Sequence, residues 1–164
     1  MDERPVSAFV GLGSNLGDRA AAIDAARRDI ATLPGTAIVA RSSTYESAPL
    51  DAGGGDFLNA VDEVRTSLDP LSLLRALQAI ETRHGRLRPY PSAPRTIDLD
   101  LLLYGDVRCA TPELVLPHPR LHERAFVMVP LAEIAPSLRI GDRGTVCDLL
   151  RGLGAQRVAK FASL

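Results

Sequence analysis

The chain has 164 residues, of which 46% are hydrophobic and 24% are charged. This length suits one domain spanning residues 1–164, because single domains commonly hold about 100–200 residues. The 19 basic and 20 acidic residues leave a formal charge of -1. Overall charge therefore excludes a domain that binds nucleic acid or a membrane surface by electrostatic attraction alone.

Neither the start of the chain nor its cysteines predicts an exported or membrane protein. The first five residues are polar, and the longest apolar run is far shorter than the ~18 residues that a spanning helix needs. The two cysteines, Cys109 and Cys147, have no zinc-binding spacing and are expected to be buried thiols. We therefore expect a reduced, cytoplasmic protein.

The first elements expected are a strand and a helix. Val6–Gly13 is a short apolar run rich in small residues, typical of a buried strand. From Asp18 onward, apolar residues recur at helical spacing until Pro34 and Gly35 end the pattern. The glycine-rich segment between the two, residues 11–17, is interpreted as a tight turn in which Ser14 or Asn15 helps to cap the helix.

Two strands are expected next. Thr36–Tyr45 is rich in β-branched residues, and Phe57–Thr66 contains an alternation of apolar and polar residues. The intervening segment, Glu46–Asp56, holds three consecutive glycines and is expected to be a loop. Together these segments predict a pair of strands that follows the first helix.

A second helix and a last strand complete the expected pattern. Asp69 followed by Pro70 is a strong helix start, and His84-Gly85 marks the helix end. Arg86–Arg95 carries three prolines and is expected to be a loop, while Thr96–Tyr104 is expected to be a strand. The remainder is expected to hold only short helices and turns, because Pro130, Pro136 and several glycines interrupt it.

The element order is therefore βαββαβ with a C-terminal extension. A strand pair between two helices indicates an α+β protein with a ferredoxin-like antiparallel sheet and helices packed on it. A Rossmann domain is disfavoured, because that fold needs successive βαβ crossovers.

The strongest chemical signal is the pair Asp98 and Asp100 in the last expected strand. Side chains alternate faces along a strand, so these carboxylates share a face, roughly 6.6 Å apart. Two adjacent carboxylates repel each other unless a cation lies between them, and Mg²⁺ is commonly held by one or two carboxylates together with substrate phosphates. The other face of the strand is expected to be apolar, formed by Ile97, Leu99, Leu101 and Leu103.

Basic residues near this strand indicate phosphate binding. The cluster before it is Arg83, Arg86, Arg88 and Arg95, and guanidinium groups match phosphate oxygens well. His118 and Arg124 are further candidates for phosphate or leaving-group contacts. A zinc pair of His118 with His122 is disfavoured, because Pro119 prevents a regular helix through both.

The residues alone thus predict a Mg²⁺-dependent enzyme that acts on a nucleotide polyphosphate. They leave the acceptor open, because a kinase and a nucleotide-sugar transferase can both use an Asp-x-Asp pair. A ferredoxin-like module that binds a nucleotide without turning it over is a further alternative, distinguished by the absence of a released product.

Four sequence blocks, taken together, resemble one family from about Ala8 to Pro136. The chain is similar to the 6-hydroxymethyl-7,8-dihydropterin pyrophosphokinases of folate biosynthesis. The blocks are Gly11–Gly17, Phe57–Ala60, Pro94–Asp100 and Pro117–Arg120.

The resemblance implies transfer of pyrophosphate from ATP to the hydroxymethyl oxygen of the pterin, with release of AMP. It implies that Asp98 and Asp100 hold two Mg²⁺ ions and that Arg86 and Arg95 are also catalytic. The residues implied to bind the pterin are Ser47, Ala48, Leu50, Phe57, Asn59 and Phe126. The residues implied to bind ATP are Gln78, Glu81, Arg86, Arg88, Arg95, Leu101, His118 and Arg124.

Two further expectations concern motion and assembly. The loops Glu46–Asp56 and Arg86–Arg95 are expected to act as lids that order when nucleotide and pterin bind. The partners expected are the two small-molecule substrates, with no nucleic acid and no membrane, and the protein is expected to be a monomer.

Overall fold

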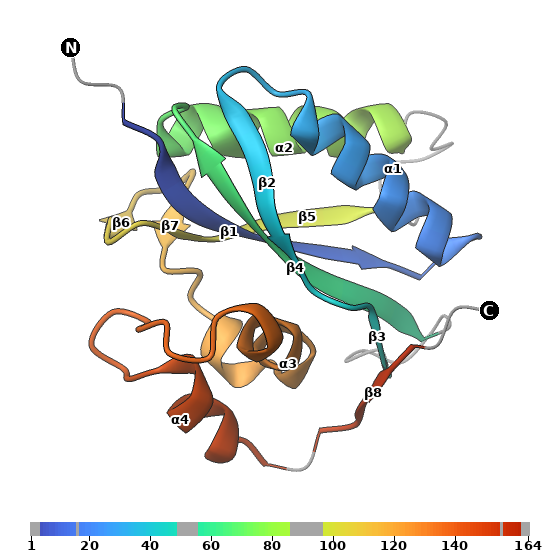
Figure 1. Cartoon of the computed structure of the whole chain (residues 1–164), viewed down its shortest axis with the longest axis vertical. Helices are drawn as coiled ribbons and strands as arrows, with labels where there is room; N and C mark the ends of the chain where they lie inside the picture. Colours follow the sequence, from blue (N-terminus) through green and yellow to red (C-terminus); the bar gives the residue numbers. More distant parts are fainter. Residues whose placement is uncertain (1–3, 16, 49–55, 86–96, 155, 162–164) are drawn as a thin grey trace.

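The structure is a computed structural model that describes residues 4–15, 17–48, 56–85, 97–154 and 156–161. One main sheet, two helical layers and a small two-stranded ribbon make up the described chain (Figure 1). The elements are β1 (Val6–Ser14), α1 (Arg19–Ala31), β2 (Thr36–Arg41), β3 (Tyr45–Ser47), β4 (Phe57–Thr66), α2 (Pro70–His84), β5 (Asp98–Tyr104), β6 (Cys109–Ala110), β7 (Val115–Leu116), the 3-10 turn η1 (Leu121–Glu123), α3 (Ala125–Ile134), α4 (Val146–Arg151) and β8 (Val158–Lys160).

The main sheet has the order β5-β1-β4-β3-β8, and β2 also pairs with β4. All of these pairings are antiparallel. The predicted ferredoxin-like fold is confirmed: β2 and β3 together supply the second strand of the motif, and β8 from the C-terminal extension adds a strand at the β3 edge.

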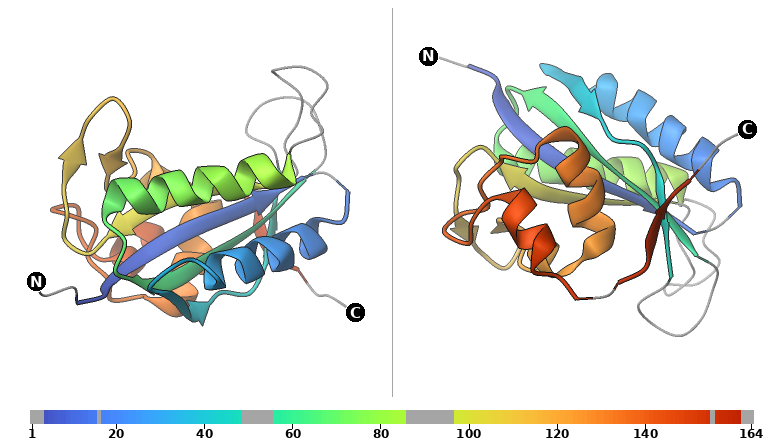
Figure 2. Two further views of the ribbon diagram at one scale, coloured as in Figure 1. Left: turned by 90° about the horizontal axis from the view of Figure 1, so that it is seen from above. Right: turned by 60° about the horizontal axis from the view of Figure 1, so that its bottom comes forward.

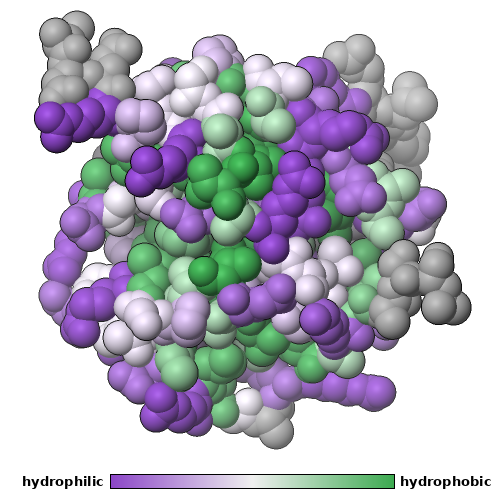
Figure 3. Space-filling model, viewed as in Figure 1, coloured by the Kyte–Doolittle hydropathy of each residue, from purple (hydrophilic) through white to green (hydrophobic). Residues whose placement is uncertain are grey.

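The two helical layers lie on opposite faces of this sheet. Figure 2 shows α1 and α2 across one face and α3 and α4 on the other. In the view of Figure 3, hydrophobic side chains show in separate patches among hydrophilic ones. Among the residues that the structure describes, no helix is both long and apolar enough to cross a membrane.

The starts of the first two helices have clear local causes. Asp18 caps α1 by accepting from the Ala21 N–H at 3.1 Å, and Asp69 caps α2 by accepting from the Ser72 N–H at 3.2 Å. The α2 prediction is thus confirmed. The α1 cap is Asp18 rather than Ser14 or Asn15, because β1 continues as far as Ser14.

The expected strand over residues 36–45 is in fact two strands. Arg41 pairs with Asp62 and Tyr45 pairs with Asn59, so four steps along one strand match three along the other. One extra residue must therefore be accommodated, as in a β-bulge. After this break β3 continues to Ser47, so the segment predicted as a loop from residue 46 begins as a strand.

A second irregularity changes the facing of β5. Phe9 pairs with Leu103 and Val10 with Leu101, so Leu102 is an extra residue. The extra residue reverses the alternation, and the prediction that Leu103 shares a face with Leu99 and Leu101 is wrong. The irregularity comes after residue 101, so the alternation around the two aspartates is kept.

The sheet separates two hydrophobic cores. One lies against α1 and α2 and includes Val10, Leu12, Leu99 and Leu101, whereas the other lies against α3 and α4 and includes Leu103. The helices after β7 are short, as expected: α3 has 10 residues, with Pro130 inside it, and α4 has 6. One smaller expectation needs correction, because both cysteines are free thiols that are only half-buried.

Candidate active site

One cavity of about 370 Å³ opens at the end of the sheet where β1 runs toward α1. It is bounded by strands β1, β3, β4 and β5 and by the start of α3. Its described lining residues are Gly11, Leu12, Gly13, Asn15, Ser47, Ala48, Phe57, Asn59, Ala60, Asp98, Asp100, Arg124, Phe126 and Val127.

The floor of the cavity is a row of residues across three strands. Gly13 of β1 pairs with Asn59 of β4 on one side and with Asp98 of β5 on the other. Gly11 pairs in the same way with Asp100. Since neighbouring strands lie about 4.8 Å apart, the backbones of Asn59 and Asp98 are separated by roughly 10 Å. The glycines between them leave this floor open.

The amide of Asn59 is held in a fixed orientation. Its side chain is 4% exposed, and its Nδ2 donates to Ser47 Oγ at 2.8 Å and to the Tyr45 carbonyl at 3.3 Å. A carbonyl oxygen can only accept, so the nitrogen must face Tyr45. The Asn59 Oδ1 lies on the side of Gly13, 3.5 Å from where a Cβ would stand there. Asn59 therefore presents a hydrogen-bond acceptor at the cavity floor.

Two aromatic rings line the cavity from different elements. Phe57 begins β4, and Phe126 lies in the first turn of α3. The Arg124 guanidinium carbon lies 5.6 Å from the centroid of the Phe126 ring. Arg124 Nε is buried, with no hydrogen-bond partner among the residues described. The cavity thus combines stacking surfaces with a cationic group that has donor capacity left over.

The two carboxylates lie on the cavity side of β5. Asp98 is half-buried and Asp100 is exposed, while Leu99 between them points into the opposite core. The strand is tied to α2 at this point, since the Leu99 N–H donates to Glu81 Oε2 at 2.8 Å.

These residues fit Mg²⁺ held jointly with a substrate. Within the described ranges, no group of three or more His, Cys, Asp or Glu side chains could hold a metal ion. Two carboxylates on an open cavity wall are nevertheless the usual protein contribution when phosphate oxygens and water complete the Mg²⁺ coordination.

His118 lies near the carboxylate end of the site. Burial lowers the pKa of its ring, Asp100 raises it, and Arg124 and Arg120 lower it further, with a net decrease. The Arg120 N–H donates to His118 Nδ1 at 3.2 Å. At neutral pH the ring is therefore uncharged, with Nδ1 as the acceptor and Nε2 carrying the proton.

Most of the described site predictions come together at this cavity. The predicted residues that line it are Ser47, Ala48, Phe57, Asn59, Asp98, Asp100, Arg124 and Phe126.

Other predicted residues are not part of the described lining or lie outside the described chain. Gln78 and Glu81 lie on α2, and His118 follows β7; none of the three belongs to the described lining. Leu101 is 3% exposed and its side chain belongs to the α1–α2 core, and its predicted contact with ATP stays a prediction. The predicted residues Leu50, Arg86, Arg88 and Arg95, and most of both expected lids, lie outside the described residues.

The sequence interpretation missed the part played by the glycines. The sequence pattern predicts a turn over residues 11–17, yet Gly11 and Gly13 lie within β1 and form part of the cavity floor. The alternation of Gly11 and Gly13 with Val10 and Leu12 was a signal that the two glycines share one face of a strand. Its meaning depends on pairing with β4 and β5, which the sequence of one strand does not show.

Comparisons with known proteins identify the family of the chain. The sequence profile of the 7,8-dihydro-6-hydroxymethylpterin-pyrophosphokinase family matches residues 9–136. The chain is 45% identical over 155 residues to the 2-amino-4-hydroxy-6-hydroxymethyldihydropteridine pyrophosphokinase of Methylorubrum extorquens, covering 92% of this chain and 98% of that protein. It is 46% identical over 143 residues to the enzyme of the same name from Pseudomonas aeruginosa, covering 87% and 88%.

Solved structures share the fold at lower identity. A crystal structure of wild-type Plasmodium falciparum HPPK-DHPS with pterin and p-hydroxybenzoate matches with a TM-score of 0.71 and 15% identity. The match covers 92% of this chain but only 43% of that longer one.

The profile match and the two bacterial relatives carry the assignment of activity. The relatives are pyrophosphokinases, which transfer pyrophosphate from ATP to the hydroxymethyl group of the dihydropterin in folate synthesis. The chain belongs to the 7,8-dihydro-6-hydroxymethylpterin-pyrophosphokinase family.

Proposed function

We propose that the cavity holds the dihydropterin between Phe57 and Phe126 and presents its hydroxyl group to ATP bound at the β5 side. The observation that carries this proposal is the convergence of two aromatic rings, an oriented amide and two carboxylates on one cavity of about 370 Å³. A flat heterocycle gains from stacking on aromatic faces.

The orientation of Asn59 supports binding of the amino-pyrimidinone edge of the pterin. That edge carries N–H donors, and Asn59 Oδ1 is an acceptor whose direction is fixed by Ser47 and Tyr45. The hydroxymethyl group lies at the opposite end of the pterin. Anchoring the donor edge at β4 therefore directs the hydroxymethyl group across Gly13 toward Asp98, roughly 10 Å away.

The carboxylate side of the cavity supports the ATP site. Asp98 and Asp100 would hold Mg²⁺, and two ions are expected. When bound, the metal would supply positive charge beside the phosphate oxygens. Arg124 Nε, which has no hydrogen-bond partner among the described residues, can donate to a phosphate oxygen. Arg86, Arg88 and Arg95 remain predicted phosphate contacts, with Gln78, Glu81 and His118 on the nucleotide side.

The reaction then balances as an in-line displacement. The pterin hydroxyl oxygen forms a bond to the β-phosphorus of ATP. The bond between that phosphorus and the oxygen bridging it to the α-phosphorus breaks, and AMP leaves. The hydroxyl proton is released. What the chain contributes is placement of the acceptor oxygen and positive charge beside the transferred group.

Three coarser features of the protein are proposed with this site. Residues 1–164 form a single domain, because one sheet serves both cores. The enzyme works as a monomer, since one chain supplies both the aromatic and the carboxylate sides of the cavity. It is cytoplasmic, in keeping with the two free thiols.

The reaction is tested by incubating the protein with ATP, Mg²⁺ and reduced hydroxymethylpterin and separating the nucleotides. We expect AMP in equal amount to pterin pyrophosphate. Release of ADP would indicate transfer of a single phosphoryl group, and no nucleotide product would indicate a binding module.

The site is tested with Phe126→Ala, measured by pterin and ATP-analogue affinity. Pterin affinity should fall about 3- to 10-fold, from the loss of stacking and contact area, while the ATP analogue binds as before. Phe161→Ala is the matched control, because Phe161 stacks with Arg19 and lies outside the described cavity lining. Equal losses for both ligands would place Phe126 in the general core instead.

A further inference from the structure

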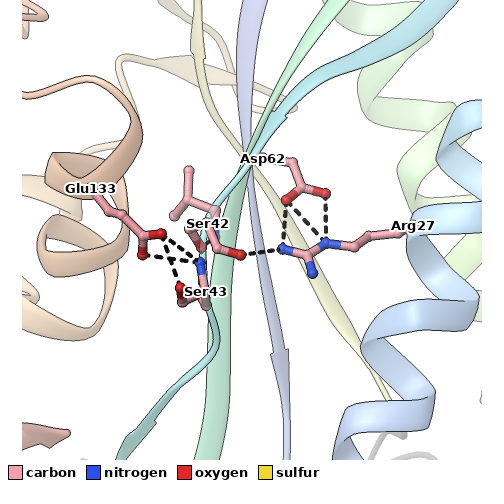
Figure 4. A network of polar contacts seen from close by, with 6 residues as sticks. Arg27, Ser42, Ser43, Asp62 and Glu133 are labelled. Atoms are coloured by element: carbon pink, nitrogen blue, oxygen red, sulfur yellow. Dashed lines mark hydrogen bonds and ion pairs between the residues drawn. The ribbon is translucent and has the colours of Figure 1, made fainter. Parts of the chain in front are cut away.

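One carboxylate outside the cavity joins the two elements that form its walls. Glu133, in the last turn of α3, accepts from the Ser43 N–H at 3.0 and 3.1 Å and from Ser43 Oγ at 3.0 Å. It also accepts from Tyr45 Oη at 2.6 Å. Figure 4 shows the Ser43 contacts spanning from α3 to the break between β2 and β3.

The joined elements carry cavity residues at some distance from Glu133. The first turn of α3 holds Phe126, which lies seven residues earlier, about 10 Å along the helix axis. Strand β3 holds Ser47, two residues after Tyr45. Glu133 is outside the described cavity lining.

Tyr45 connects this contact directly to the oriented amide. Its hydroxyl donates to Glu133, and its backbone carbonyl accepts from Asn59 Nδ2 at 3.3 Å. Tyr45 is 9% exposed, and it is the cross-strand partner of Asn59. A displacement of Tyr45 would therefore move an acceptor that fixes the direction of the Asn59 side chain.

The break beside Tyr45 is held from both helical layers. From α1, Arg27 Nη2 donates to the Ser42 carbonyl at 3.0 Å while the same guanidinium pairs with Asp62. From α3, Glu133 accepts from Ser43 (Figure 4). Arg27 of α1 bonds to Asp62 of β4 and to Ser42, so it fixes the break itself. Glu133 alone of these two ties the break to the helix that carries Phe126.

The position of this carboxylate is unfavourable for α3 taken alone. A negative charge in the last turn of a helix opposes the helix dipole. Three donor groups on the β2–β3 segment offset this, and Lys160 of β8 adds a favourable charge nearby. The carboxylate is therefore explained by its contact with β3 rather than by helix stability.

We propose that Glu133 is a positioning residue for the pterin side of the site, acting through Tyr45 and Ser43. It holds α3 and β3 at the spacing that a ring between Phe126 and β4 requires, and it keeps the Asn59 acceptor aimed at the cavity floor. This inference rests on the proposed location of the pterin site.

The test compares Glu133→Gln, Tyr45→Phe and the double variant, each with pterin and ATP-analogue affinities measured separately. Each single variant should weaken pterin binding roughly 3- to 10-fold, since a hydrogen bond contributes about 1 kcal/mol. ATP-analogue affinity should stay within about twofold. If both changes break one shared contact, the loss of pterin affinity in the double variant should not exceed the product of the two single-variant losses. It should lie closer to the larger of those two losses.

Controls separate this role from folding and from the site assignment. Glu113→Gln removes a carboxylate that pairs with Arg75 at the surface, and it should leave both affinities unchanged. Tyr45→Phe removes a single hydroxyl and keeps the ring, so it keeps the test valid if Glu133→Gln folds poorly. Three results would overturn the proposal: unchanged pterin affinity in Tyr45→Phe, equal losses of affinity for pterin and the ATP analogue, or a double-variant loss equal to the product of the two single-variant losses.

Phe126→Ala tells the two failures apart. If that variant binds pterin normally, the pterin site has been misplaced and the role of Glu133 falls with it. If Phe126→Ala loses pterin affinity while Glu133→Gln and Tyr45→Phe keep it, only the positioning role is overturned.

Discussion

The two faces of the same sheet differ at the end where the cavity opens. On the face covered by α1 and α2, residues such as Leu12, Leu58 and Leu99 are at most 4% exposed and form a continuous core. On the other face, their chain neighbours Gly13 and Asn59 form the floor of an open cavity. Each strand thus alternates a core residue with a site residue.

This arrangement separates stability from chemistry along one strand. Side chains of neighbouring residues point to opposite faces, so adjacent positions experience different surroundings. The carboxylates and the glycines would weaken a hydrophobic core, yet here they face the cavity. We therefore expect substitutions on the cavity face to reduce turnover with little change in stability, and substitutions at adjacent core positions to reduce stability with little change in substrate binding.

The largest effect is expected on the cavity face of β5. Asp100→Ala, or the equivalent change at Asp98, should reduce turnover by at least about 100-fold, because a main source of charge stabilisation at the phosphates is lost. The melting temperature should change by no more than about 2 °C, since Asp100 is exposed. Steady-state kinetics at several Mg²⁺ concentrations would check this. Near-normal activity would contradict the assignment of the carboxylates.

Substitution of Leu101, the next residue in β5, should lower stability rather than activity. Leu101→Ala removes a side chain that is 3% exposed in the α1–α2 core, which should cost about 2–5 kcal/mol of unfolding free energy. Urea denaturation would measure the loss. At a temperature where the variant is folded, ATP-analogue affinity should be close to that of the parent. A selective loss of ATP affinity without destabilisation would show that the Leu101 side chain itself contacts the nucleotide.

The cavity floor offers a smaller and more selective test. A Cβ at Gly13 would stand 3.5 Å from Asn59 Oδ1 and 3.8 Å from Phe57 Cδ1, which are ordinary contacts. Gly13→Ala should therefore fold normally, whereas Gly13→Val should crowd the bound ring and weaken pterin binding about tenfold. Calorimetric titration of both variants would check the order. Equal pterin affinity for the alanine and valine variants would show that the ring lies elsewhere.

Local patterns were sufficient to predict the fold and the carboxylate pair. Asp69-Pro70 identified the start of α2, and the spacing of Asp98 and Asp100 identified a shared strand face. Both signals depend on residues close in sequence. The likeness to a known family, rather than any local pattern, brought Phe57 and Phe126 together.

Long-range pairing explains what the sequence did not show. The extra residue at Leu102 becomes visible only when β5 is aligned with β1. It places Leu103 on the opposite face from the one predicted. Glu133 and Ser43 are 90 positions apart, and nothing near either residue indicates the other. Such contacts depend on how the layers pack, so neither periodicity nor spacing predicts them.

The smallest effect expected is the pH dependence of the Glu133 contact. Partial burial raises the pKa of Glu133, but the hydrogen bonds from Tyr45 and Ser43 outweigh this and leave the pKa below its ordinary value of 4.5. A lowered folded pKa gives stability that is present above the unfolded value and is lost as the pH falls through the folded one. Burial and Glu133 raise the pKa of Tyr45 to about 12, so the phenol still donates throughout this range.

Comparing the parent with Glu133→Gln from pH 7 to pH 3 isolates this contribution from that of the other carboxylates. Because Glu133 is exposed and its charge is screened by water, the difference in unfolding free energy should be less than about 1 kcal/mol. The difference should be constant above pH 4.5 and shrink as the solution becomes more acidic. A difference that grows toward pH 3 would mean that the folded state prefers protonated Glu133, so its hydrogen bonds do not favour the carboxylate.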